Sequence, residues 1–309
     1  MRPYNTLSDY LKARFGCRVF KVSLNAGLTC PNRDGTKGRG GCTYCEPETL
    51  APPGFDPRQS IRAQLDGNIE RVRARHNAEK FIAYFQINTS THAPLDYLER
   101  IYSEALGAPG VAGIVVSTRP DCLGEGVLDL LSSLGDRLLW AELGLQTSND
   151  ATLARVNRGH TAAEFAHAVE RARHRGIDVC AHMIIGLPGE GADDVIGTAE
   201  FLARLGVWGV KFHQMQVIRS TELERQYERG AFVLPGLEDY ARFVVECLLR
   251  LPPASVIHRL SGDVPDRYLV APRWGANKFI IAERVIGLMR ERGARQGDMY
   301  RGGSATGFL

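Results

Sequence analysis

Short apolar runs alternate along the chain with longer stretches in which apolar positions recur every three or four residues. Six runs have the length and composition of buried strands, and they begin at Arg18, Phe81, Gly113, Leu138, Ile177 and Trp208. Between them lie stretches with the spacing of an amphipathic helix, such as the one carrying Ile61, Leu65 and Ile69. Continuous apolar strands alternating with helices predict a parallel sheet covered by helices.

Six strand–helix units predict an α/β fold, either a partial (βα)6 TIM-like barrel or a doubly wound sheet. In both, the chemistry lies at the carboxyl ends of the strands. No linker or low-complexity segment interrupts the pattern. We therefore expect a core over residues 1–251 and a C-terminal extension over residues 252–309, which closes the barrel and is a candidate for substrate contact.

Composition narrows the class of protein. A hydrophobic content of 44% and a charged content of 24% are typical of a soluble protein with a sizeable core. The net charge of +3 permits an anionic partner such as RNA without requiring one. Neither an apolar run of membrane-spanning length nor a secretory leader is evident, so we expect a cytoplasmic protein. In that compartment the seven cysteines are thiols or metal ligands rather than disulfides.

Three of these cysteines, Cys30, Cys42 and Cys45, follow the first predicted strand within "CPNRDGTKGRGGCTYC". The glycines of this stretch let the backbone wrap closely around a bound group. A CxxC pair is compatible with zinc, for which Cys17 is a candidate fourth ligand. Cys17 precedes the first strand, however, and is expected at the opposite end of the barrel. Three thiolates alone favour a [4Fe–4S] cluster with one open iron, and zinc remains the alternative.

Polar side chains on the inner strands form a second group of candidates. Glu142 and Gln146 are four residues apart on one strand and so share a face, as do Lys211 and His213 on another. A carboxylate in an apolar strand needs a partner, which the barrel interior offers. His182 lies on the strand between these two. The alternatives are an internal salt bridge and core histidines without a chemical role.

Several stretches together resemble a known family. They are "LNAGLTCPNRDGTKGRGGCTYC", "STRPDCL", "ELGLQTSNDATLARVNRGHT", "HMIIGLPGE", "HRLSGD" and "APRW". From Tyr4 to about Met299, the chain resembles the YhcC/YtqA (MnmL-like) family of radical SAM enzymes, with similarity to the radical SAM core of the Elongator catalytic subunit. The cysteine spacing departs from the CxxxCxxC of the superfamily, and this departure is characteristic of the family.

The resemblance implies a [4Fe–4S] cluster held by Cys30, Cys42 and Cys45, at which S-adenosylmethionine is reductively cleaved to a 5′-deoxyadenosyl radical. It makes Lys211 and His213 catalytic candidates. Candidates for cofactor contact are Tyr44, Gln86, Asn88, Ser117, Arg119, Glu142, Gln146, Arg158, His182 and Gly186. The alternatives are loop packing for Tyr44, turns and helix caps at the strand ends, and a turn joining Arg119 to Asp121.

The resemblance also implies a substrate. Gram-positive members of the family are associated with tRNA wobble-uridine modification, in which a C5 carboxymethylaminomethyl side chain is converted towards aminomethyl, and a different substrate is the alternative for other members. The expected partners are tRNA and an electron donor such as flavodoxin or ferredoxin, with no membrane and no DNA. The alternatives are a radical SAM enzyme acting on a small metabolite or protein side chain, and a zinc-stabilised RNA-binding module without catalysis.

The C-terminal segment adds a modest indication of RNA. A group that combines basic and aromatic types, and that could hold a phosphate and stack on a base, is His258, Arg259, Asp263, Arg273, Trp274 and Lys278. Further basic residues, expected on the last helix, are Arg284, Arg290, Arg292 and Arg295. The alternative is a capping segment held by ordinary ion pairs with a solvated charged face.

Overall fold

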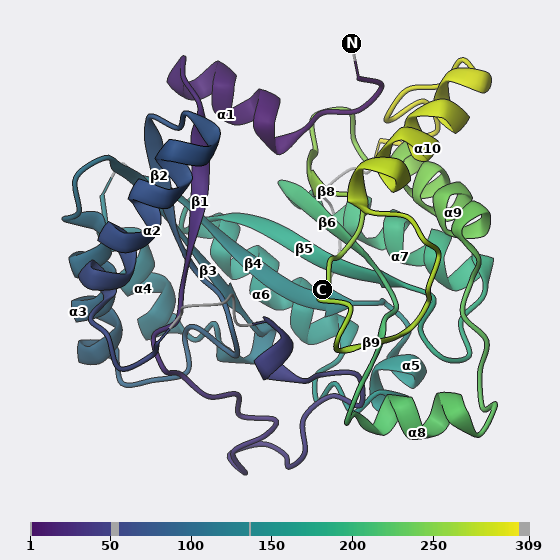
Figure 1. The fold of residues 1–309 in the computed structure, drawn as a ribbon, viewed down its shortest axis with the longest axis horizontal. Coiled ribbons are helices and arrows are strands. Elements are labelled where there is room, and N and C mark those ends of the chain that lie inside the picture. The colour runs from purple at the N-terminus through teal and green to yellow at the C-terminus, as the bar shows by residue number, and fades with distance from the viewer. Residues whose placement is uncertain (1, 51–55, 136, 303–309) are drawn as a thin grey trace.

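The structure is a computed structural model that describes residues 2–50, 56–135 and 137–302. Seven parallel strands form one sheet that curves into a partial barrel (Figure 1). In their order across the sheet they are β1 (Val19–Leu24), β2 (Lys80–Phe85), β3 (Val111–Thr118), β4 (Leu138–Gln146), β5 (Asp178–Ile185), β6 (Gly209–Gln214) and β8 (Val256–Arg259).

Helices cover the convex side of this sheet and close one end (Figure 1). The longer ones are α1 (Leu7–Phe15), α2 (Ile61–His76), α3 (Leu95–Leu106), α4 (Glu125–Ser133), α6 (Ala162–His174), α7 (Ala192–Leu205), α9 (Leu237–Arg250) and α10 (Lys278–Glu291). Shorter elements are η1 (Pro47–Leu50), η2 (Pro120–Cys122), α5 (Asp150–Arg155), β7 (Val217–Ile218), α8 (Glu222–Glu228) and β9 (Leu269–Ala271).

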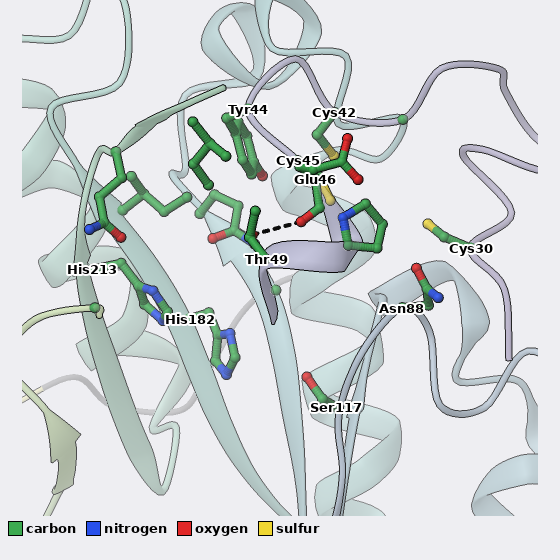
Figure 2. A pocket seen from close by; sticks show the side chains of 18 of the residues that line it. Cys30, Cys42, Tyr44, Cys45, Glu46, Thr49, Asn88, Ser117, His182 and His213 are labelled. Atoms are coloured by element: carbon green, nitrogen blue, oxygen red, sulfur yellow. Dashed lines mark hydrogen bonds between the residues drawn. The ribbon is translucent and has the colours of Figure 1, made fainter. Parts of the chain in front are cut away.

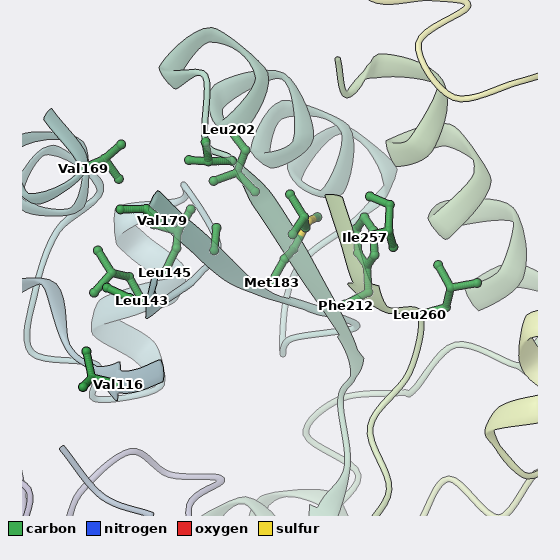
Figure 3. Packing of buried hydrophobic residues seen from close by; sticks show 14 of the residues in the cluster. Val116, Leu143, Leu145, Val169, Val179, Met183, Leu202, Phe212, Ile257 and Leu260 are labelled. Carbon is green, nitrogen blue, oxygen red and sulfur yellow. The ribbon is translucent and has the colours of Figure 1, made fainter. Parts of the chain in front are cut away.

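Side-chain alternation along the strands separates two apolar layers. On the outer face, Leu143, Met183 and Phe212 pack with Val169 of α6 and Leu202 of α7 (Figure 3). The inner face is apolar only near the end at which the strands begin, where the described side chains of Trp140, Ile82 and others meet those of α1. Closer to the carboxyl ends the inner face becomes polar, so side chains that could form a functional site lie there.

Local sequence signals explain where these helices start. α6 begins with a capping box in which Thr161 Oγ1 accepts from the Glu164 N–H and the Glu164 carboxylate accepts from the Thr161 N–H. Thr6 caps α1 with a single contact, in which its hydroxyl accepts from the Asp9 N–H, and Gly16 ends that helix at a φ of 68°. Among the described helices, none has the length and apolar character needed to cross a bilayer.

The prediction of a partial parallel barrel is confirmed, with one strand more than the six predicted. The seventh, β8, pairs with β6 and comes from the stretch expected to be an extension. Its four residues include a histidine and an arginine, so no apolar run marked it. The run beginning at Trp208 divides in two, because β7 leaves the sheet and pairs antiparallel with β9.

Candidate active site

A cavity of about 240 Å³ opens at the carboxyl ends of the strands (Figure 2). The cysteine loop, the ends of β2 to β6 and the turn after β8 all contribute to its wall. Of the predicted site residues, those that line it are Cys30, Cys42, Tyr44, Cys45, Asn88, Ser117, Arg119, Gln146, Arg158, His182 and His213. Residues distant in sequence thus converge where a parallel α/β fold places its active site.

The cysteine loop is held in shape by its own backbone. The N–H groups of Arg33 and Asp34 donate to the Cys30 carbonyl over 2.8 and 3.0 Å, and the Cys45 N–H donates to the Cys42 carbonyl over 3.0 Å. Gly41 has a φ of 79°, and a Cβ there would lie 2.8 Å from Arg33 Cγ. Glycine at this position therefore lets the loop fold over Arg33 and present all three thiols to the cavity.

Two hydrogen-bond donors, the positive guanidinium of Arg158 and the neutral amide of Asn32, lie beside the thiol of Cys42. Arg158 Nη1 lies 3.7 Å and Asn32 Nδ2 3.8 Å from Cys42 Sγ, and Arg158 Nη2 donates to the Gly144 carbonyl over 2.6 Å. Burial, aided by the nearby charge of Cys42, raises the pKa of the Cys45 thiol to about 12. A thiol in such surroundings becomes a thiolate only when a cation or metal compensates its charge.

These residues fit an iron–sulfur cluster with a bound polar cofactor. The donors are three cysteines, and buried polar atoms around them lack protein partners: Thr43 Oγ1, Tyr44 Oη, Arg119 Nη1 and Arg158 Nε. Within the described residues, no three His, Cys, Asp or Glu side chains have the spacing of a single bound ion. A cluster binds its cysteines through different irons, so its ligands surround a volume rather than a point.

Glu142 lies below the cavity at the centre of a buried polar network. Its carboxylate is 2.9 Å from Lys21 Nζ and 2.6 Å from Lys211 Nζ. Tyr84 Oη donates to it over 2.6 Å, and His182 Nε2 over 2.9 Å. The internal salt bridge weighed from the sequence is therefore present. Glu142 and Lys211 do not line the cavity, whereas His182, which donates to Glu142, does.

Burial and charge determine the protonation of this network. Burial alone would raise the pKa of Glu142, but Lys21 and Lys211 outweigh it and hold that pKa well below its ordinary value. Burial lowers the pKa of Lys211 to about 7 despite the carboxylate. It also lowers the pKa of His182 to about 3 and that of His213 well below its ordinary value. Both histidines are therefore neutral at pH 7.

Besides Glu142, two predicted cofactor contacts lie outside the cavity wall. Gln86 is not a wall residue, because its amide donates to Ser23 Oγ over 2.8 Å. Gly186 lines a separate hollow, where its φ is 94° and a Cβ would lie 2.8 Å from Pro235 Cδ. The glycine is thus explained by a turn and by packing against Pro235. Arg119 does line the cavity, but its guanidinium also donates to both carboxylate oxygens of Asp121, over 2.9 and 3.0 Å. This contact is the turn joining Arg119 to Asp121 that was weighed from the sequence.

Residues that sequence reasoning did not single out also contribute. Lys21 and Tyr84 are polar residues within apolar strands, on the same face as Glu142, so strand alternation was an available signal. Asn32 donates to the Asn157 carbonyl over 2.6 Å and so ties the cysteine loop to the segment carrying Arg158. That contact joins positions 125 residues apart, which no local pattern encodes.

The C-terminal basic residues are mostly paired. Arg284 contacts Glu238 and Glu291, and Arg292 contacts Glu246 over 2.6 Å. Their placement on one last helix is partly wrong, because α10 ends at Glu291, before Arg292 and Arg295. His258 is buried edge-on against Trp140 and Trp208, and Trp274 packs on Tyr240. Lys278 pairs with Asp263 over 3.2 Å, and Arg273 donates to the carbonyls of Leu269 and Val270.

Comparisons with known proteins agree with this site. The model of the radical SAM superfamily matches residues 30–202, and the Radical_SAM C-terminal domain matches residues 207–291. YtqA of Bacillus subtilis (strain 168) is 37% identical over 299 residues, which are 96% of this chain and 93% of YtqA. YhcC of Escherichia coli (strain K12) is 36% identical over 293 residues, 94% of each chain.

Among solved structures, the archaeal Methanocaldococcus infernus Elp3 with an N-terminal deletion superposes with a TM-score of 0.70 at 20% identity. The match covers 90% of this chain but 64% of that one, and it shows a shared fold. The match to the radical SAM superfamily model sets aside a non-catalytic zinc module in favour of an enzyme. The chain belongs to the radical SAM superfamily and, within it, to the YhcC/YtqA family, and its cofactors are S-adenosylmethionine and a [4Fe–4S] cluster.

Proposed function

We propose that this enzyme modifies the C5 side chain of tRNA wobble uridine, converting a carboxymethylaminomethyl group towards aminomethyl. The observation that carries the proposal is similarity along almost the whole chain to YtqA, together with an Elp3-like fold. The family resemblance associates both with wobble-uridine side chains. The cavity has three cysteines at one side and neutral histidines at the other, so a substrate side chain that enters it would lie between them (Figure 2). This arrangement supports the proposal.

In this proposal the residues of the chain divide the work. Cys30, Cys42 and Cys45 would hold the cluster, which together with S-adenosylmethionine and an electron donor such as flavodoxin or ferredoxin would supply radical chemistry for hydrogen abstraction. Arg158 keeps positive charge beside Cys42, and its Gly144 contact fixes the guanidinium. The buried network under His182 holds that wall of the cavity rigid, so that the reacting groups stay oriented and water is excluded.

The test is nucleoside mass spectrometry of total tRNA from cells that lack the gene, complemented with the wild-type chain or with Cys42→Ala. We expect the deletion and the Cys42→Ala strain to lose the aminomethyl-type nucleoside and to accumulate its carboxymethylaminomethyl precursor. Wild-type complementation should restore the product. Cys17→Ala is the matched control, because Cys17 precedes β1 at the far end of the barrel.

The possible outcomes test the tRNA substrate and the assignment of the cluster ligands separately. An unchanged nucleoside profile in the deletion strain would contradict the tRNA proposal and direct the search to metabolites or protein side chains. Restoration of the product by Cys42→Ala would instead contradict the assignment of that cysteine to the cluster. Purified Cys42→Ala should also form no 5′-deoxyadenosine after anaerobic reconstitution.

A further inference from the structure

An irregularity in strand pairing turns Arg259 into the barrel. Val210 of β6 pairs with Ile257, but the next residue, Lys211, pairs with Arg259, so β8 contains one extra residue. Such a bulge breaks the side-chain alternation of the strand and redirects the side chain that follows it. As a result His258 and Arg259 both face inward, and Arg259 joins the cavity wall.

Among the residues that the structure describes, none supplies a carboxylate partner to the guanidinium of Arg259. Its Nη2 lies 2.7 and 2.9 Å from the two ring nitrogens of His213, and its Nε is buried without a hydrogen-bond partner. Across the described residues, no acidic side chain forms an ion pair with it, and the nearby Asp263 is paired with Lys278. His213 accepts a hydrogen bond here, which agrees with its neutral ring.

Neighbouring residues keep the space beside this guanidinium open. The Gln214 amide clamps Gly262, accepting from its N–H over 2.8 Å and donating to its carbonyl over 3.0 Å. A Cβ on Gly262 would lie 3.2 Å from His213 Nδ1 and 3.5 Å from Arg259 Nη2. The turn is therefore fixed, and glycine removes the atom that would crowd the two side chains.

The local charge balance is positive. Glu142 is the one buried carboxylate of the described network, and it already contacts both Lys21 and Lys211. His182 and His213 are neutral, so Arg259 is a surplus cation. Figure 2 shows these histidines on the side of the cavity away from the cysteine sulfurs. An uncompensated guanidinium in such a place is stabilised by an anion that enters the cavity.

We propose that Arg259 binds a carboxylate of the substrate at the wall opposite the cysteines. The planar guanidinium matches a carboxylate, and a cation without an acidic partner among the described residues, beside His213, matches a single negative charge. This inference rests on the proposed function, which identifies the carboxylate as that of the carboxymethylaminomethyl side chain. Arg259 thereby selects the modified uridine that carries the acid over one that lacks it.

The test uses reconstituted enzyme and two anticodon stem-loop RNAs, one with a carboxymethylaminomethyl wobble uridine and one with the methyl ester of that side chain. For the wild type we expect kcat/KM about 100-fold higher with the acid, because the ester leaves Arg259 unpaired. Arg259→Gln should lose this preference by lowering kcat/KM for the acid about 100-fold while changing the ester little. Arg259→Lys keeps the positive charge but loses the paired N–H donors of the guanidinium, so kcat/KM for the acid should fall about tenfold.

Binding and folding are measured alongside turnover. Fluorescence anisotropy with labelled RNAs should show the same loss of preference in Arg259→Gln, and circular dichroism checks that the variants fold. Arg242→Gln is the control, since Arg242 lies exposed on α9 and pairs with Asp239. It should behave as wild type throughout.

Three results would overturn the assignment, each for a different reason. If Arg259→Gln still prefers the acid, another group binds the carboxylate, and the proposed function survives. If Arg259→Gln loses S-adenosylmethionine affinity, or forms less 5′-deoxyadenosine without RNA, the bound carboxylate belongs to that cofactor. If the wild type converts neither RNA, the proposed function itself fails, and the assignment fails with it.

Discussion

At the scale of single residues, Glu142 shows how one buried charge organises an interior. It accepts from Tyr84 and His182 and contacts two lysines, although its own side chain is fully buried. Removing one member of a buried ionic group leaves the others uncompensated, which costs more free energy than the intact group contributes. The arrangement therefore explains why an acid stands in an otherwise apolar strand.

Glu142→Gln should lower the free energy of unfolding by about 3 kcal/mol at pH 7, because Lys21 and Lys211 lose their counter-ion. The pKa of Glu142 is held well below its ordinary value of 4.5, so its contribution is complete above that pH. It is lost as the pH falls through the lowered pKa of the folded state. Urea unfolding from pH 7 down to pH 3 should show the difference between wild type and variant shrinking below about pH 4.

The control for this measurement is Glu238→Gln, which removes an exposed partner of Arg284. Solvent screens that pair, so its variant should unfold close to wild type at every pH. A difference between wild type and Glu142→Gln that stays constant from pH 7 to pH 3 would mean that the pKa of Glu142 is the same in the folded and the unfolded protein. The salt bridges would then not be its main role.

At the scale of elements, apolar continuity made the strands predictable. Runs such as Val111–Thr118 and Asp178–Ile185 are buried on both faces, so their apolar character is nearly unbroken. Such a run can be recognised in the sequence without knowing which strands lie beside it. β8 could not be predicted in this way, because its inward residues are His258 and Arg259. The same holds for the Glu142 network, whose members come from five strands and meet only once the barrel closes.

The cysteine loop was predictable from the sequence, whereas the polar residues that line the rest of the cavity were predictable only in part. Three cysteines in a glycine-rich loop after a strand indicate their chemistry locally. Whether a polar side chain at a strand end faces the cavity depends on backbone irregularities, which the sequence does not display. Gln146 has a φ of 80° next to a register shift in β4 and so lines the cavity. Gln86 turns to Ser23 instead.

Gly144→Ala tests that irregularity in β4. A Cβ at this position would lie 2.4 Å from Arg158 Nη2 and 2.6 Å from Gln146 Nε2, so both side chains must move. Because Arg158 then leaves Cys42, we expect 5′-deoxyadenosine formation by reconstituted enzyme to fall at least about tenfold while the fold is retained. The rate is measured by mass spectrometry and the fold by circular dichroism.

Gly197→Ala is the matched control for that change. Gly197 lies within α7, and a Cβ there meets nothing within 4 Å. Alanine in a helix interior should raise stability by about 1 kcal/mol without altering the rate. Cleavage by Gly144→Ala at the wild-type rate would show that Arg158 does not need its observed position.

At the scale of the whole molecule, the two ends of the described chain are joined through β8. The Asn5 carbonyl accepts from the Ile257 N–H over 2.8 Å, and Thr6 forms a parallel bridge with Ile257. The segment after α10 returns to the same place, where the Gln296 N–H donates to the Pro3 carbonyl over 2.9 Å. The strand that carries Arg259 is thus fixed from both sides.

Gln296→Ala should show how strongly this junction holds the barrel. The buried amide accepts from the Asn5 N–H and donates to the carbonyls of Pro252 and Ser255, at 2.7 to 2.9 Å. Alanine leaves these backbone groups unpaired, so the free energy of unfolding should fall by about 2 kcal/mol. Hydrogen exchange should accelerate at the backbone N–H of Ile257, two residues before Arg259.

The control is Gln226→Ala on α8, which loses one weak contact to Glu222 and should match wild type. Unchanged exchange at Ile257 would mean that β8 is held by the sheet alone, and that residues after α10 do not support the cavity.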